Sequence, residues 1–210
     1  MGQVPPWAEA PRTALAEAGL AVVAGWTEPE GLIPPFLTGQ APGCPPEEGR
    51  VDAVLDVLDP LLHEKANADW YRLSVEGGLF SATDRRFLLP LGPEDGPGPA
   101  RWHCVELRAD WDVMGRGAAG PLGSAFCRPE FRMLALDSGV LCFGTTWEHA
   151  ISTSVLTAPN RSRVLRRFAA WVAEGAPDDP ACCPDMSRAR CCTLCPTPAP
   201  APGAVRARPL

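Results

Sequence analysis

Cysteine is the residue whose type and spacing in this chain most directly suggest chemistry. Five of the nine cysteines lie between residues 182 and 195, in the segment CCPDMSRARCCTLC. Four thiolates can close a tetrahedral zinc site, and Cys192 and Cys195 have the two-residue spacing of a zinc knuckle. The other half would be Cys182 or Cys183 with Cys191, whereas established modules separate their pairs by about 12 residues or more. We therefore predict no metal, and we keep a site of Cys183, Cys191, Cys192 and Cys195 as the alternative.

The segment GRGAAG at residues 115–120 matches the dinucleotide-binding pattern G-x-G-x-x-G. That pattern binds phosphate only where a buried strand precedes the glycines and a long helix follows them. Here Pro121, Gly123 and Pro129 follow, so no helix of three turns fits. We therefore predict a loop between strands and no cofactor.

A polar cluster contains the residue types of general acid and base catalysis. His103, Asp110 and Asp112 lie near one predicted strand, and His149 follows another. Such side chains serve hydrolases, or ligate a catalytic metal, when they converge in one pocket. Alternation, however, places His103 on the same face as Val105 and Leu107, which favours a half-buried histidine. A hydrolase using His103, Asp110, Asp112 and His149 is therefore the alternative, and a protein without catalysis is the favoured interpretation.

Seven tryptophans stand against a single tyrosine. Three of the seven fall at strand ends or in loops beside charged residues. Exposed tryptophan near fixed charge is typical of the residues that dominate binding interfaces. The predicted binding residues are Trp102, Trp111, Arg116, Trp147 and Glu148.

Helices at both ends of a strand-rich middle must position these side chains. Apolar spacing predicts a helix near residues 11–18, a second over 47–65 kinked at Pro60, and a last one over 160–174 capped by Asn160. Alternation in residues 71–75, followed by Gly77 and Gly78, predicts a strand and a hairpin turn. The sequence thus predicts an α+β fold, with a mostly antiparallel sheet of about five to six strands over residues 70–156 and helices packed on it.

Proline marks the boundaries of the predicted domain. A proline-rich loop or linker covers residues 29–49 within a single domain over 1–176. The tail over 177–210 holds few large apolar side chains and is predicted to be disordered. The abrupt change of composition there also allows a frame or annotation artefact.

Charge and composition restrict the partners and the compartment. The net charge is −6, and no segment has the basic excess that binds nucleic acid. No stretch approaches the length of a membrane span, and the start resembles no export signal, which predicts a cytoplasmic protein. A composition with 20 glycines, 25 prolines and arginine in place of lysine indicates a GC-rich genome, such as a bacterial one.

These features favour a small cytosolic binding or regulatory domain that recognises a protein or a small ligand. Bacterial toxin-neutralising immunity proteins share its size and acidity. Oligomeric state has no signal in the sequence.

Overall fold

The computed structural model describes residues 13–92, 99–124 and 128–174. The chain divides into one unit that ends at Ala170 and a second that begins at Trp171, of which residues 171–174 are described. The predicted tail lies outside the described residues, and with it Cys183, Cys191, Cys192 and Cys195. Among the described residues, no helix combines the length and the hydropathy needed to cross a bilayer.

An antiparallel sheet of seven strands forms the centre of the first unit, in the order β1-β4-β3-β7-β8-β9-β2. The α+β prediction is confirmed, with slightly more strands than expected. Two further short strands, β5 and β6, pair with each other. The strands are β1 (Leu20–Val22), β2 (Arg50–Asp56), β3 (Arg86–Leu91), β4 (Arg101–Leu107), β5 (Gly123–Ser124), β6 (Arg128–Pro129), β7 (Phe131–Leu134), β8 (Val140–Thr146) and β9 (Ala150–Thr157).

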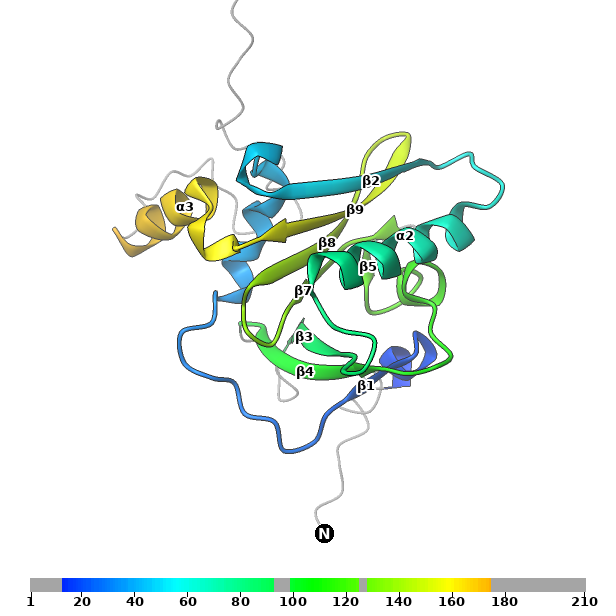
Figure 1. The fold of residues 1–210 in the computed structure, drawn as a ribbon, viewed down its shortest axis with the longest axis horizontal. Coiled ribbons are helices and arrows are strands. Elements are labelled where there is room, and N and C mark those ends of the chain that lie inside the picture. Colours follow the sequence, from blue (N-terminus) through cyan, green and yellow to red (C-terminus); the bar gives the residue numbers. More distant parts are fainter. Residues whose placement is uncertain (1–12, 93–98, 125–127, 175–210) are drawn as a thin grey trace, which may run out of the picture. The chain divides into compact units, whose positions relative to one another are not determined.

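Successive side chains of the central strands point to opposite sides of the large sheet and enter two apolar clusters, one on each face. In β3, Phe87 lies in one apolar cluster and Leu88 in the other. Helix α2 (Leu62–Gly77) contributes Trp70 to the first cluster and packs against β9 and β2, as Figure 1 shows. The 3₁₀-helix η1 (Pro35–Gly43) and the first turn of α3 (Arg163–Ala173) contribute to the second cluster.

The predicted helix over residues 47–65 is wrong. Residues Pro46–Glu48 form the short 3₁₀-helix η2, and β2 follows, paired along its whole length with β9. Valine and leucine at positions 51, 54 and 55 fit helical spacing as well as strand alternation. Pairing with β9 stabilises the strand instead of the helix. Ala53 and Leu55 pack under α2, whereas Val54 points to the opposite face.

The predicted strand over residues 71–75 is also wrong, because these residues belong to α2. Ala66, Trp70 and Leu73 recur at helical spacing and are buried. Gly77 and Gly78 end the helix rather than turn a hairpin. Gly78 has φ 87° and its N–H bonds to the carbonyl groups of Ser74 and Val75, which is a glycine C-cap.

The last helix is present but begins later than predicted. Asn160 lies in the short 3₁₀-helix η4 (Pro159–Arg161), and α3 starts at Arg163. The Ser162 hydroxyl accepts a hydrogen bond from Leu165 N at 3.4 Å, so Ser162 takes the capping role expected of Asn160. Residues 135–139 separate β7 from β8.

Candidate functional site

The structure does not bring together the histidines of the predicted acid and base cluster. His103 lies in the middle of β4, opposite Leu89 of β3, and His149 lies in the hairpin between β8 and β9. Three to four strand spacings of about 4.8 Å separate these elements, or roughly 14–19 Å. That separation exceeds hydrogen-bond reach even through a water molecule. His149 is exposed and lies 3.5 Å from the carboxylate of Glu148.

Asp112 organises the loop that follows β4. It caps the short π-helix η3 (Val113–Gly117) and accepts hydrogen bonds from Gly115 N at 2.8 Å and Arg116 N at 2.9 Å. The Asn67 side chain donates a third bond at 2.7 Å. Burial alone would raise the pKa of Asp112, but these hydrogen bonds together lower it below its ordinary value. Asp110 is exposed and only pairs with Arg116 at 3.2 Å.

The glycines of residues 115–120 have packing roles. A Cβ on Gly115 would lie 2.6 Å from the Asp112 carboxylate, and one on Gly117 would lie 2.9 Å from the Leu122 side chain. The N–H groups of Gly115 and Arg116, which a phosphate would need, already bind Asp112. This segment therefore has the geometry of a tight loop around a carboxylate and not of a phosphate cradle.

Two of the predicted binding tryptophans are structural. Trp102 is 1% exposed, and its indole N–H donates to the carbonyl of Ile33 at 2.6 Å. Trp111 is half-buried and stacks on Tyr71 with ring centres 5.4 Å apart. Trp102 ties the loop at Ile33 to the sheet and Trp111 ties the loop after β4 to α2, which leaves little indole surface for a partner.

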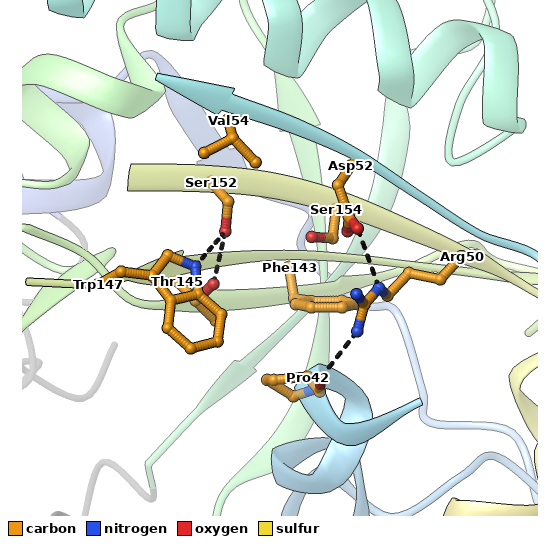
Figure 2. Close-up of a pocket in the computed structure, with 9 residues that line it drawn as sticks. All are labelled: Pro42, Arg50, Asp52, Val54, Phe143, Thr145, Trp147, Ser152 and Ser154. Carbon is orange, nitrogen blue, oxygen red and sulfur yellow. Dashed lines mark hydrogen bonds and ion pairs between the residues drawn. The ribbon is translucent and has the colours of Figure 1, made fainter. Parts of the chain in front are cut away.

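A groove lies on the face of the sheet opposite α2, over β2, β9 and β8. Figure 2 shows Arg50 at one end, Trp147 at the other and two serines between them. Its volume is about 190 Å³. The groove is lined by Pro42, Arg50, Asp52, Val54, Phe143, Thr145, Trp147, Ser152 and Ser154.

Arg50 fixes one end of the groove. Its Nη1 donates to the carbonyl groups of Pro42 at 2.8 Å and Cys44 at 2.7 Å, which ties the end of η1 to the sheet. Its Nε donates to Asp52 at 3.1 Å. Arginine suits this position because its planar fork can serve several acceptors at once. The two charges cancel, so this end of the groove is polar but close to neutral.

Buried hydroxyl groups form the middle of the groove, above the ring of Phe143. Ser152 and Ser154 are only 4% and 3% exposed. The Ser152 hydroxyl lies 2.7 Å from Thr145 Oγ1 and accepts from the Trp147 indole at 3.3 Å. Within the residues that the structure describes, the Ser154 side chain makes no hydrogen bond. Ser154 therefore offers a hydroxyl to a group that enters the groove.

Trp147 forms the other end of the groove and is 57% exposed. Its position at the end of β8 follows from the hairpin, which Trp147 N closes with the carbonyl of Ala150 at 2.7 Å. The indole N–H is held by Ser152, so the ring is fixed while its face stays accessible. Fixed, exposed tryptophan beside a cavity is a common feature of binding hot spots.

The residues that line the groove lack the constellation of a hydrolase. Among the described residues, no histidine or lysine hydrogen-bonds to Ser152 or Ser154, the contact that would activate a serine as a nucleophile. Nor do the described residues contain three His, Cys, Asp or Glu side chains grouped to hold a metal ion.

A second hollow of about 470 Å³ runs along β1 and includes His103 and Arg108. Its remaining lining residues are apolar or glycine, from Ala16 and the segment 20–26. No carboxylate lines it, so His103 has no acidic partner there. It therefore provides no acid and base pair.

Three cysteines are described, and all are buried free thiols: Cys44, Cys104 and Cys142. Burial raises the pKa of each, and that of Cys142 reaches about 12 although Ser74 donates a hydrogen bond to it. The thiolate, which is the reactive form, is therefore disfavoured.

Most of the groove was missed by the sequence analysis. Trp147 and its neighbour Glu148 were singled out, but Arg50, Asp52, Ser152 and Ser154 were not. The only available signal is the segment ISTSVLT, in which hydroxyl side chains occupy a strand that is otherwise apolar.

The chain matches no protein-family model, no curated protein and no solved structure.

Proposed function

We propose that this chain is a non-catalytic binding domain that recognises another protein through the groove and the adjoining Trp147 hairpin. The observation that carries the proposal is the exposed, hydrogen-bonded indole of Trp147 beside a groove that is lined by the hydroxyl-bearing residues Thr145, Ser152 and Ser154. A fixed aromatic side chain loses little conformational freedom when it binds.

The size of the groove favours a protein over a small molecule. Sites for drug-sized ligands measure about 300–1,000 Å³, whereas this groove measures about 190 Å³. It has room for one inserted side chain. Such a side chain would contact Phe143 and Trp147 with its stem, and its polar end would bond to Ser154.

The surroundings of the groove extend the same surface. Val54 lines it and is 60% exposed. Trp147 and Val54 thus supply apolar area on either side of the hydroxyl groups, and Glu148 adds a charge at the rim. An apolar centre with a polar rim is the usual anatomy of a protein interface.

Nucleic acid does not suit this surface, because its single arginine is already bound to Asp52 and to two carbonyl groups.

We also place the protein in the cytoplasm. The free thiols of Cys44, Cys104 and Cys142, the three cysteines described, support a reducing compartment.

Co-purification from the organism of origin tests the proposal. Tagged wild type should recover a stoichiometric protein, and Trp147→Ala should lose it. Leu58→Ala is the matched control, because Leu58 is the most exposed large apolar side chain described, at 86%, and lies outside the groove. Loss of the partner in both variants, in neither, or no partner with wild type would contradict the proposal.

A further inference from the structure

The outer edge of β2 is the longest open edge of the large sheet. At the opposite edge, β1 has three residues, whereas β2 has seven. In the described part of the chain, β2 pairs only with β9. It contains neither proline nor a bulge, two of the devices that prevent pairing with another strand. Charged side chains are a third such device, and β2 has Arg50, Asp52 and Asp56.

The pairing with β9 determines which main-chain groups of β2 point outward. Val57 N donates to His149 O and Thr157 N donates to Gly49 O, so odd-numbered residues bond to β9. In an antiparallel ladder the even-numbered residues then point their N–H and C=O groups away from it. Those residues are Arg50, Asp52, Val54 and Asp56.

The outward groups are available for pairing. Within the described residues, the main chain of Arg50, Asp52 and Val54 makes no hydrogen bond on this side. Asp56 O alone accepts a bond there, from Asp59 N. Exposed apolar side chains accompany the edge, with Val51 56% and Val54 60% exposed. Both features call for a strand that covers them.

We propose that this strand is β2 of a second copy of the chain, paired antiparallel about a two-fold axis that passes beside Ala53. The proposal goes beyond the partner-binding function and does not depend on it. In this register all seven residues of β2 face a residue of the second copy. It is also the register that the charges select.

Charge complementarity supports the register on the groove side of the sheet. Arg50 faces Asp56 of the second copy, and Asp52 faces Val54, each pair occurring twice. The Nη2 group of Arg50 makes no hydrogen bond to the described residues and would donate to Asp56 of the second copy. A shift by two residues in either direction places an aspartate opposite an aspartate, either Asp52 with itself or Asp52 with Asp56. Like charges directly opposite each other destabilise a strand pair.

Apolar complementarity supports the register on the α2 side. Val51 faces Leu55 of the second copy, and the small Ala53 faces itself on the axis. Because residues opposite each other in a sheet share a face, both grooves would open on the same side of a continuous sheet. The dimer would therefore offer a partner two grooves in tandem.

Cysteine trapping in the full-length protein tests the register. Residues facing each other at Ala53 would have Cα atoms about 4.5 Å apart, within the disulfide range of about 4.4–6.8 Å. The two copies of Val51 would lie roughly 14 Å apart, because four residues of strand separate them. Under mild oxidation, Ala53→Cys should therefore link two copies, and Val51→Cys should not. Position 51 is the stringent control, since it is the more exposed of the two.

Peptide mapping keeps the native cysteines from confusing the result. Trypsin releases residues 51–65, which contain no native cysteine, so a disulfide-linked pair of this peptide reports only the introduced residue. Equal linkage at positions 51 and 53, or linkage at neither, would overturn the register.

Sedimentation of the wild type provides a second measurement that needs no folding of a variant. We expect a mass of about twice 22.4 kDa. Asp56→Lys should raise the dissociation constant of the dimer at least tenfold, because the new lysine would face Arg50 of the second copy. Glu106→Lys on β4, which makes the same change of charge, should leave the dissociation constant unchanged. A wild type that stays monomeric would refute the dimer. The co-purification test of partner binding through Trp147 is independent of that result.

Discussion

Replacement of Asp112 should unfold the loop after β4 and cost a large share of the stability of the domain. Three hydrogen bonds converge on its carboxylate, from Gly115 N, Arg116 N and Asn67 Nδ2. Bonds to charged groups contribute about 1.5–3 kcal/mol each, but the side chain is 28% exposed, so water replaces part of this. We expect Asp112→Ala to lower the free energy of unfolding by about 2–4 kcal/mol, and Asp112→Asn by about half as much.

Urea unfolding measured by tryptophan fluorescence provides the assay, because Trp111 precedes the loop and stacks on Tyr71. Asp110→Asn is the matched control. It removes a carboxylate that pairs with the same arginine, but one that is 91% exposed, and it should change stability by less than about 1 kcal/mol. If Asp112→Ala costs no more than Asp110→Asn, the reasoning is refuted.

We expect the loss of stability in Asp112→Ala to depend on pH. The folded-state pKa of Asp112 is lowered, so its contribution is complete above the ordinary carboxyl range and is lost as the pH falls through the folded-state value. The stability difference between wild type and Asp112→Ala should therefore shrink with acid, starting below about pH 4. A difference that stays constant down to acid unfolding would contradict this.

Three further predictions concern the groove and the core. Ser152→Ala should lower the free energy of unfolding in urea by about 1–2 kcal/mol, because Thr145 and Trp147 lose their hydrogen-bond partner. Ser154→Ala should be within about 0.5 kcal/mol of wild type. The reverse order would contradict the hydrogen-bond assignment. Cys142 should resist iodoacetamide at pH 8 until the protein unfolds, because its pKa is about 12, and mass spectrometry of its peptide would reveal any labelling of the folded state. Gly117→Ala should lower the free energy of unfolding by about 1–3 kcal/mol, because its Cβ would press on Leu122. A lower melting temperature would show this loss, and an unchanged one would argue against the close packing.

The sequence predicted the α+β class because a buried strand such as β8 stands out locally as a short apolar run. It failed at β2 and α2 for a physical reason. Val51, Val54 and Leu55 satisfy helical spacing, and only the partner strand β9, a hundred residues away, decides between strand and helix. Glycines 77 and 78 likewise favour a hairpin or a helix cap according to what precedes them.

The candidate site was predictable only at Trp147. Arg50 and Asp52 come from one edge strand, and Ser152 and Ser154 from the next, so nothing in their local sequence shows that they meet. The opposite error occurred at His103 and His149. Their residue type suggested a shared site, but the strand order separates them by three to four spacings, and no local pattern encodes strand order.

Photo-crosslinking from the groove, in the organism of origin, tests the central claim most directly. Benzoylphenylalanine in place of Glu148, which adjoins Trp147 and leaves its indole intact, should crosslink to one partner protein. The same residue in place of Phe36, an aromatic that is 44% exposed but does not line the groove, should not. Crosslinking from position 36 alone, or from neither position, would contradict the claim that this groove is the binding surface.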